Sequence, residues 1–340
     1  MRQVVIPREG APEVLELREE TDPIPKRGEV RIRVEASGLN FSDLLARLGL
    51  YPDRPKLPVV MGYEVAGRID ALGDDVDGDW LGRDVLALTR FGGHADVVCC
   101  PEMQVFARPS GMSAEEGAAL PVNYLTAHQL LVVMGGLRAG DCALVHSAGG
   151  GVGIAAFQIA KQIGAEVIGT ASAGKHEFLR SQGMDHCIDY TREDFVARTL
   201  EITRGRGVEL AIDAVGGSSF EKSYRCLART GRLGMFGNAA MVTGMERSYF
   251  RMAGALVRTL RASWKATRLI GANKGVFGVN LGRMWNEADR VAGWMEILLE
   301  SYAAGAIRPV IAERFPLAEA ASAHRYLHER RNIGKVILTP

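Results

Sequence analysis

The stretch GDCALVHSAGGGVGIAAFQIAK, residues 140–161, decides how the rest of the chain is interpreted. Residues 142–146 are mostly apolar and predict a buried parallel strand, and the small residues 147–151 predict a tight turn. The apolar spacing from residue 152 onward predicts a helix, which Gly164 would end. A strand, a glycine turn and a helix in this order direct backbone N–H groups and a positive helix end toward one spot, which suits a pyrophosphate.

The glycine spacing follows the dinucleotide fingerprint G-x-G-x-x-G with one departure. Ala148 occupies the place of the first glycine, and Gly150 and Gly153 are the second and third. A glycine cluster alone is weak evidence, because an ordinary tight turn also uses glycine. The strand before it, the helix after it and a further strand at 166–169 supply the context that the fingerprint requires. We therefore predict a dinucleotide site at Gly150, Gly151, Val152 and Gly153.

From residue 121 onward, predicted strands alternate with predicted helices. The strands are 142–146, 166–169, 186–189, 208–212 and 232–236, and the helices are 152–163, 175–182, 191–203 and 219–228. Thr191 with Asp194 resembles a capping box at the start of the third helix. This rhythm indicates an open, doubly wound parallel sheet with helices on both faces, an α/β fold. Residues 276–279 predict a further strand at the edge of the sheet.

The two ends of the chain have a different pattern. Residues 1–120 contain short apolar runs separated by Gly, Pro and Asp, which predicts a β-rich, barrel-like unit. Within it, residues 40–51 have helical spacing. Near the other end, residues 287–304 and 317–330 predict helices, and residues 307–311 and 335–338 predict closing strands.

Composition limits the classes of protein to which the chain can belong. Its 340 residues favour two domains, and 47% hydrophobic with 24% charged residues is typical of a globular protein. A net charge of +1 predicts no nucleic-acid partner. The five scattered cysteines predict reduced thiols and a cytoplasmic location, and the chain opens without a leader pattern. The apolar window 118–137 contains Asn123, His128 and Gln129, so we expect a core helix there and no membrane span.

Residues 247–286 carry an unusual charge pattern, with eight basic residues and no acidic one. On a helical wheel of about 100° per residue, a basic sector lies beside an apolar stripe. The sector contains Arg247, Arg251, Arg258, Arg261, Lys265 and Arg268. Three interpretations stay open: a solvated helix face, a site for the anionic tail of a ligand, or weak contact with a membrane surface through 247–268.

Several motifs together resemble the quinone oxidoreductase/zeta-crystallin subgroup of the medium-chain dehydrogenase/reductase superfamily. They are Gly140-Asp141, Leu144, residues 148–153, Gln158 and Lys161, the run 38–43 with Arg47, Gly49 and Tyr51-Pro52, residues 62–67, and Arg330 with 334–336. The segments LPVNYLTAH (120–128), GTASAGKHE (169–177) and IDY (188–190) resemble its vesicle amine transport protein branch more closely. The resemblance covers nearly the whole chain.

The resemblance implies a GroES-like β-barrel catalytic domain made of residues 1–121 and 283–340. It also implies a Rossmann NADP-binding domain at 122–282. In this superfamily two Rossmann sheets pair at their edge strands, so the resemblance further implies a homodimer through 276–279. Relatives in the vesicle branch are associated with membranes.

The family comparison also bears on zinc. Zinc-dependent relatives have a cysteine in the region of Asn40 and a histidine in the Gly-His-Glu run where this chain has Tyr63. An amide and a phenol are not usual zinc ligands, and the adjacent Cys99 and Cys100 cannot reproduce a four-cysteine lobe. We therefore predict a zinc-independent protein. Without a Lewis acid, interconversion of alcohol and aldehyde is disfavoured, whereas hydride delivery to a quinone or an enone needs less help.

The residues after the second Rossmann strand favour NADPH (NADP+) over NADH. NAD-binding units place a carboxylate about 20 residues past the glycines, and here the sequence is GTASAGK (169–175), without an acid. Ser172 and Lys175 can bind a 2′-phosphate that a carboxylate would repel. Lys175 can also be an ordinary exposed lysine at a helix start. The resemblance adds Tyr190 and Arg330 to this pocket, and it adds Asn332 to the cofactor-binding residues.

The nicotinamide end and the catalytic residues rest mainly on the resemblance. It implies that Asn40 and Thr126 lie near the nicotinamide or its ribose. Val215-Gly216 and Phe236-Gly237-Asn238 follow predicted strands, where an open sheet binds its ligand. Asp213 can equally be a structural carboxylate.

For catalysis, Tyr51 matches a tyrosine proposed as the acid in enoyl-thioester reductases, but it can also be a half-buried loop tyrosine. Asn40 is a candidate to polarise a carbonyl. Asp43 is a candidate to hold Asn40 or Arg47 in place.

Together these features predict an NADPH-dependent, zinc-independent oxidoreductase that reduces quinones or α,β-unsaturated carbonyl compounds. One alternative is an enoyl-thioester reductase in which the basic segment holds a phosphorylated pantetheine tail. Another is a non-catalytic NADPH-binding protein at a membrane surface. The sequence does not choose among the substrates.

Overall fold

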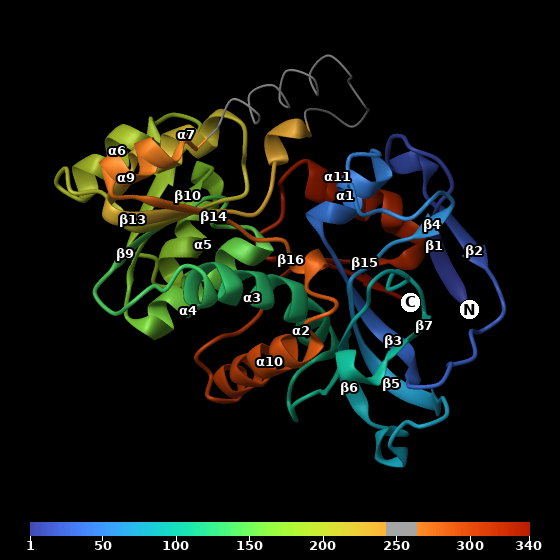
Figure 1. Cartoon of the computed structure of the whole chain (residues 1–340). Coiled ribbons are helices and arrows are strands. Elements are labelled where there is room, and N and C mark those ends of the chain that lie inside the picture. The colour runs from blue at the N-terminus through green and yellow to red at the C-terminus, as the bar shows by residue number, and fades with distance from the viewer. Residues whose placement is uncertain (243–263) are drawn as a thin grey trace. The chain divides into compact units, whose positions relative to one another are not determined.

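The computed structural model describes residues 1–242 and 264–340 (Figure 1). The chain forms two compact units. The first contains Met1–Leu125 and Leu281–Pro340, and the second contains the described residues between Thr126 and Asn280. Four residues of the predicted basic sector, Arg247, Arg251, Arg258 and Arg261, lie outside the described residues.

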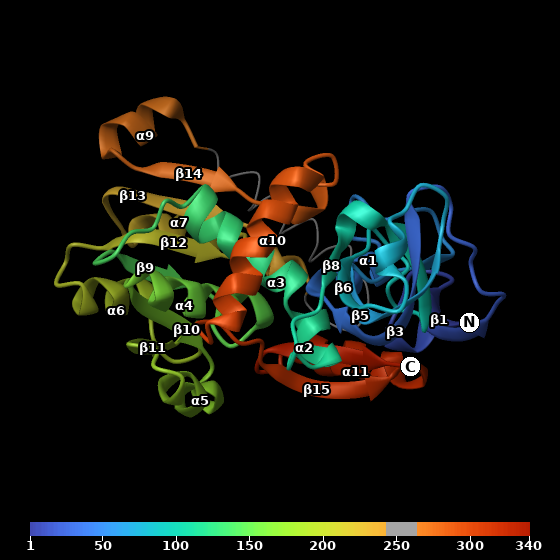
Figure 2. The ribbon, with the colours of Figure 1, turned by 90° about the horizontal axis from the view of Figure 1, so that it is seen from below.

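The second unit is built on a six-stranded parallel sheet with the order β11-β10-β9-β12-β13-β14, which can be followed in Figure 2. Its strands are β9 (Cys142–Val145), β10 (Glu166–Ala171), β11 (His186–Asp189), β12 (Val208–Asp213), β13 (Leu227–Met235) and β14 (Gly275–Gly278). Leu144 of β9 lies opposite Ile168 of β10 and Ala211 of β12, and all three are fully buried. The prediction of an α/β parallel sheet is confirmed.

Helices connect these strands. They are α4 (Gly151–Ile163), α5 (His176–Ser181), α6 (Phe195–Ile202), α7 (Ser218–Arg225) and α9 (Ala266–Ala272). Helix α4 ends at Gly164, which has a φ of 90° that glycine adopts readily. The predicted start of α6 at residue 191 is wrong. Asp194 is the N-cap and accepts a hydrogen bond from the Val196 N–H at 2.8 Å, while Thr191 donates to Asp189.

The first unit combines both ends of the chain in one sheet of order β15-β16-β3-β5-β6-β8, with β7 also paired to β3. Its strands are β3 (Glu29–Leu39), β5 (Glu64–Leu72), β6 (Asp84–Leu88), β7 (Val97–Pro101), β8 (Val105–Ala107), β15 (Ile311–Pro316) and β16 (Lys335–Thr339). Val336 of β16 lies opposite Leu39 of β3, so the last strand completes a sheet begun near residue 30. The predicted strand at 307–311 is wrong, because β15 begins only at Ile311.

A small second sheet and five helices complete the first unit's description. The small sheet has the order β2-β1-β4, with β1 (Arg2–Ile6), β2 (Glu16–Glu19) and β4 (Val59–Val60). The helices are α1 (Phe41–Arg47), α2 (Ala114–Ala119), α3 (Pro121–His128), α10 (Ala288–Ala303) and α11 (Ala320–His328). Helix α3 contains the boundary between the two units and continues into a π-helical turn at Gln129–Val133, so the apolar window 118–137 is not one regular helix.

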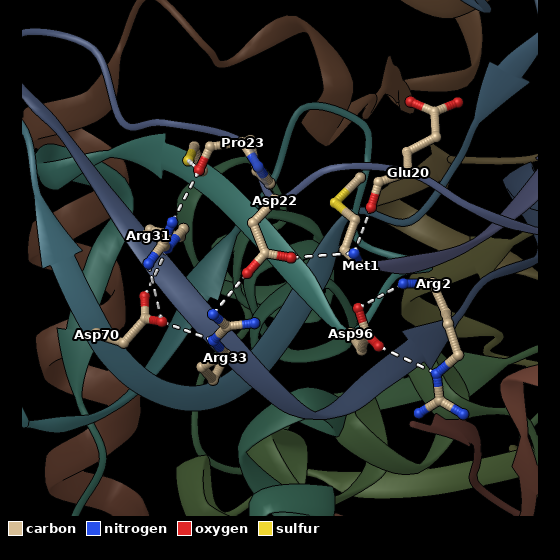
Figure 3. Close-up of polar contacts among 10 residues, drawn as sticks. Met1, Arg2, Glu20, Asp22, Pro23, Arg31, Arg33, Asp70 and Asp96 are labelled. Atoms are coloured by element: carbon tan, nitrogen blue, oxygen red, sulfur yellow. Dashed lines mark hydrogen bonds and ion pairs between the residues drawn. The ribbon is translucent and has the colours of Figure 1, made fainter.

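Ion pairs join the start of the chain to β3 and β5 (Figure 3). The Met1 amine lies 3.0 Å from Asp22, Asp22 pairs with Arg33 at 2.6 Å, and Arg33 shares Asp70 with Arg31. The hydrogen bond that Arg31 donates to Asp70 raises the pKa of Arg31. The Arg33 side chain is 48% exposed, so each of its two ion pairs contributes about 1 kcal/mol at most to the free energy of unfolding.

Two further predictions can be compared with the structure. All five cysteines are free, in agreement with the reduced thiols expected from their number and spacing. Among the residues that the structure describes, no helix is both long and apolar enough to cross a membrane.

Candidate active site

The glycine turn after β9 has the geometry of a phosphate-binding loop. Ser147 starts the turn with a φ of 54°, and Gly150 is the N-cap of α4. A Cβ atom on Gly153 would lie 2.3 Å from the Ser147 carbonyl oxygen and 2.7 Å from the Ala148 Cα, so glycine is required where the helix packs against the turn. The predicted cofactor residues Gly150–Gly153 therefore open a helix whose first N–H groups have no partner within the helix.

Ala148, which replaces the first glycine of the fingerprint, fits because its neighbour is a glycine. A Cβ atom on Gly169 of β10 would lie 2.9 Å from the Ala148 Cβ. The Ala148 N–H also donates to the Thr170 carbonyl at 3.0 Å. The turn thus keeps its close contact with β10 despite the extra methyl group.

Lys175 lies over the glycine turn. It ends a short 3-10 helix at Ala173–Lys175 that follows β10, and Ser172 is the N-cap of that helix. A Cβ atom on Gly149 would lie 2.7 Å from the Lys175 Cδ, so the alkyl part of the lysine crosses the face of this glycine. No carboxylate occurs at residues 170–175. The loop can therefore hold an anion with the Lys175 ammonium and the Ser172 hydroxyl.

The other predicted cofactor residues of this unit also follow strands. Tyr190 comes directly after β11 and is 43% exposed. Val215-Gly216 follows β12, and Phe236-Gly237-Asn238 follows β13. A Cβ atom on Gly216, whose φ is 79°, would lie 2.3 Å from the Asn238 Oδ1, so these two loops touch. Because the strands are parallel, the loops after β9, β10, β11, β12 and β13 all lie at the same edge of the sheet, where the strands end.

Three predicted cofactor residues have simpler surroundings. Thr126, in α3, is buried. Arg330 follows α11 with a φ of 58°. Asn332 is also buried, and its Nδ2 donates to the Gly334 carbonyl at 2.8 Å. Arg330 and Asn332 belong to the first unit, whereas Ser172, Lys175 and Tyr190 belong to the second.

In the first unit, Asn40 is the N-cap of α1 and is 8% exposed. Its amide oxygen accepts a hydrogen bond from the Lys335 ammonium at 2.6 Å. Its Nδ2 donates to the Glu64 carboxylate at 3.1 Å and to the Gly38 carbonyl at 3.3 Å. In this geometry both amide N–H groups and the amide oxygen are engaged, which suits a residue that positions the site.

Glu64 links three parts of the first unit. One carboxylate oxygen accepts from Asn40 and forms an ion pair with Lys335. The other accepts from the Val122 N–H at 2.7 Å, at the start of α3. Glu64 is fully buried and Lys335 is 3% exposed, so the pair is shielded from solvent. A buried charge that had lost its partner would be strongly destabilising.

Asp43 and His94 form a second buried pair beside Asn40. The Asn40 N–H donates to Asp43 Oδ2 at 2.7 Å, and the same oxygen lies 3.5 Å from His94 Nε2. Burial raises the pKa of Asp43 and lowers that of His94, which favours the uncharged form of each. Asp43 thus holds the backbone N–H of Asn40.

Tyr51 belongs to an aromatic cluster with Tyr63, the residue directly before β5, and Phe91. Its ring stands edge-on to Tyr63 with centroids 6.1 Å apart, and Tyr63 packs against Phe91 at 5.7 Å. Trp285 and Val122 contact the same cluster. The Tyr63 hydroxyl is buried, and it interacts with the Tyr51 hydroxyl closely enough to influence the pKa of both phenols. Burial raises the pKa of both phenols, so both are protonated at neutral pH.

The residues at the family's zinc position do not fit that metal. Asn40, Tyr63, Glu64 and Lys335 offer an amide, a phenol and one carboxylate that already binds an ammonium group. Elsewhere in the described part of the chain, no group of three His, Cys, Asp or Glu side chains is arranged to hold an ion.

Sequence reasoning did not identify two of these buried pairs. Lys335 and Glu64 lie 271 residues apart, and Lys335 is the first residue of a strand, where no pattern marks it as buried. His94 lies in a glycine-containing loop with no signal that it would face Asp43. Glu64 had one weak signal, because it follows Tyr63 in the run that resembles Gly-His-Glu.

Comparisons with known proteins agree with this geometry. Residues 26–127 match the alcohol dehydrogenase GroES-like domain, and residues 182–338 match the zinc-binding dehydrogenase family model. The human synaptic vesicle membrane protein VAT-1 homolog is 40% identical over 329 residues, which cover 96% of this chain and 82% of that protein. The chain belongs to the medium-chain dehydrogenase/reductase superfamily.

Other members of the superfamily are also similar. The Pseudomonas aeruginosa quinone oxidoreductase is 36% identical over 97% of both chains. The mycobacterial protein Rv1454c, solved in complex with NADPH, is 30% identical with a TM-score of 0.88 and covers 100% of both chains. The chain spans 65% of the length of the zebrafish VAT-1 homolog. These findings confirm the predicted resemblance to quinone oxidoreductases and VAT-1 proteins.

Proposed function

We propose that this chain is an NADPH-dependent reductase of quinones or α,β-unsaturated carbonyl compounds. The observation that carries the proposal is the placement of Lys175 over Gly149, beside a loop with no carboxylate. An ammonium group there favours the 2′-phosphate that distinguishes NADPH from NADH. The NADPH complex of Rv1454c and the similarity to the P. aeruginosa quinone oxidoreductase support it.

The residues that would hold NADPH fall into three groups. Gly150–Gly153 would bind the pyrophosphate, and Ser172, Lys175, Tyr190 and Arg330 would bind the adenosine phosphate, while Asn332 is a cofactor-binding candidate without an assigned part of the cofactor. Thr126, Val215, Gly216, Phe236, Gly237, Asn238 and Asn40 would surround the nicotinamide and its ribose. The loops of the second unit fit, because Gly150 is the N-cap of α4, whose first N–H groups have no partner within the helix, and Lys175 lies over Gly149. When bound, NADPH supplies a hydride.

The chain's own residues would supply the proton and hold the site in place. Tyr51 is protonated because burial raises its pKa, so its hydroxyl can donate a proton to an enolate that forms on an enone. Lys335 holds the Asn40 amide, and Asp43 holds the Asn40 backbone. We assign positioning roles to Asn40 and Asp43, and the role of proton donor to Tyr51. A quinone needs no dedicated acid, because solvent can protonate the hydroquinone.

The test is a panel of quinones and free enones with the purified full chain, followed by the loss of NADPH absorbance, with NADH as the control. We expect at least one compound to be reduced with a higher kcat/KM for NADPH than for NADH. Oxidation of NADPH by none of them would contradict the proposal. A CoA thioester included in the panel distinguishes an enoyl-thioester reductase, which would reduce it faster than the matching free enone.

We also propose that the chain forms a homodimer through the edge of the six-stranded sheet. Strand β14 ends the sheet and pairs only with β13 among the described strands. An unpaired strand edge is a ready surface for pairing with a second copy. Sedimentation equilibrium at micromolar concentration should give the mass of two chains, and the mass of one chain would contradict the proposal.

A further inference from the structure

A buried chain of hydrogen bonds runs across three neighbouring strands of the second unit. The Thr170 hydroxyl, at the end of β10, lies 3.0 Å from His146 Nδ1, and His146 directly follows β9. His146 Nε2 lies 2.9 Å from the Ser223 hydroxyl of α7, and that hydroxyl lies 2.6 Å from Asp213 Oδ2 at the end of β12. All four residues are at most 3% exposed.

The direction of each hydrogen bond follows from the chemistry of the groups. The carboxylate of Asp213 only accepts, so the single proton of Ser223 must point to it. The Ser223 oxygen can then only accept from His146, which places the imidazole proton on Nε2. His146 Nδ1 is left as an acceptor for the Thr170 hydroxyl. Burial lowers the pKa of His146, which agrees with a neutral ring in this one tautomer.

The residues of this hydrogen-bond series also hold the loops that were assigned to the cofactor. Asp213 Oδ1 accepts from the Val215 N–H at 2.7 Å and from the Gly216 N–H at 3.2 Å. His146 precedes Ser147, the first residue of the glycine turn. The Thr170 carbonyl accepts from the Ala148 N–H, and Thr170 lies two residues before Ser172. The loops after β9, β10 and β12 are therefore joined by one buried chain of polar contacts.

We propose that Thr170, His146, Ser223 and Asp213 form a positioning network that fixes these three loops for NADPH, with His146 as its central residue. The inference rests on the proposed NADPH-dependent function. A single neutral tautomer of His146 sets its hydrogen bonds with Thr170 and with Ser223. Loss of either hydroxyl therefore removes the coupling between the glycine turn and the Val215-Gly216 loop. Asp213 is in this view a structural carboxylate, the alternative that its sequence position left open.

Ser219 provides a matched control. Its hydroxyl donates to the same oxygen, Asp213 Oδ2, at 2.7 Å, and it is 8% exposed, but none of its hydrogen bonds reaches His146. Ser219→Ala therefore removes one donor from Asp213 and leaves the series of hydrogen bonds Thr170–His146–Ser223–Asp213 intact. Ser223→Ala removes a donor from the same oxygen and also breaks the chain.

The experiment measures the Kd of NADPH by fluorescence titration for Thr170→Val, Ser223→Ala, their double variant and Ser219→Ala, with thermal unfolding of each. We expect Thr170→Val and Ser223→Ala each to raise the Kd about tenfold, which corresponds to about 1.4 kcal/mol. The double variant should have a Kd for NADPH no higher than that of the single variant with the higher Kd, because both substitutions act through His146. Thr170→Ser keeps the hydroxyl and should retain the wild-type Kd.

Nitrogen-15 NMR of the His146 ring supplies a readout without cofactor. We expect a neutral ring with its proton on Nε2, and a protonated ring or the Nδ1 tautomer at neutral pH would overturn the inference. An unchanged NADPH Kd in Thr170→Val and Ser223→Ala, with only their Tm lowered as in Ser219→Ala, would also overturn it. Failure of the wild-type chain to bind NADPH would instead overturn the proposed function, and this inference with it.

Discussion

Lys335 and Asn40 meet in the interior of the first unit, with the lysine Nζ 2.6 Å from the amide oxygen, although 295 residues separate them in sequence. Lys335 also forms an ion pair with Glu64. The ammonium group is thus a buried positive charge beside Asn40, the residue that stands in the region of the cysteine of zinc-dependent relatives. It neutralises Glu64 and orients Asn40 at the same time.

Replacement of Lys335 by Met should strongly destabilise the protein. The change leaves the Glu64 carboxylate buried without a positive partner, which costs about 3–5 kcal/mol in the free energy of unfolding. Urea denaturation of the full chain measures this loss. The double variant Lys335→Met with Glu64→Gln removes both charges and should recover part of it. A double variant less stable than Lys335→Met would contradict the ion pair as the cause.

Replacement of Tyr51 by Phe should separate enones from quinones. Loss of a proton donor lowers the enone rate by about 10²–10⁴-fold, whereas a quinone that solvent can protonate should lose much less. Tyr63→Phe is the matched control, because it keeps the ring that packs against Tyr51 and removes a hydroxyl to which no proton transfer is assigned. Equal losses for enone and quinone in Tyr51→Phe would argue against Tyr51 as the acid.

Replacement of Lys175 by Ala should lower the selectivity for NADPH. A hydrogen bond to a charged group contributes about 1.5–3 kcal/mol, so kcat/KM for NADPH should fall about tenfold or more while that for NADH is unchanged. Gly149→Ala should act in the same direction, because its Cβ would displace the flexible Lys175 side chain.

Gly153→Ala serves as the contrasting variant. Its Cβ would meet backbone atoms of Ser147 and Ala148, which cannot move aside as a lysine side chain can. We expect this variant to lose both NADPH and NADH binding. An intact NADPH preference in Lys175→Ala would show that another residue recognises the phosphate.

The stability of the protein should fall as the pH drops below about 6.5. Burial lowers the pKa of His324 well below its usual value, and neither ring nitrogen has a hydrogen-bond partner among the described residues. In that pH range the unfolded chain binds a proton that the folded protein excludes. One such histidine changes the free energy of unfolding by up to about 1.4 kcal/mol per pH unit.

The variant His324→Leu tests this assignment, with urea midpoints measured from pH 7.5 to 5.5. His94 and His146 act in the same direction as His324, whereas the raised pKa of Asp43 opposes them because its contribution is lost as the pH rises. His324→Leu should therefore reduce the slope by about one proton without abolishing it. An unchanged slope would show that His324 binds its proton equally in the folded and unfolded states.

The alternation of strands and helices in the second unit could be predicted because each buried strand is a short apolar run. The start of α6 was missed because Thr191 and Asp194 are both good N-cap residues, and their competition is decided by Asp189, which binds Thr191. The start of β15 was placed too early, because Ile307 and Ile311 are apolar in a strand-like pattern whether or not the segment between them pairs.

The site was only partly predictable for a different reason. The glycine turn and Lys175 belong to local patterns, so the sequence spacing was enough to make them cofactor-binding candidates. The contacts of Asn40 with Lys335 and of Asp43 with His94 join distant segments, and a single sequence carries no signal for such pairs. Buried polar partners of this kind become visible only when the fold brings the segments together.

The pairing of β3 with β16 has a consequence for synthesis on the ribosome. The second unit is encoded between the two parts of the first, so every residue of the second unit is made before Lys335. Until then the nascent first unit lacks both the strand that completes its sheet and the cation that neutralises Glu64. The order of translation thus makes the Rossmann unit the earlier one to be finished, and closure of the first unit's sheet a later step.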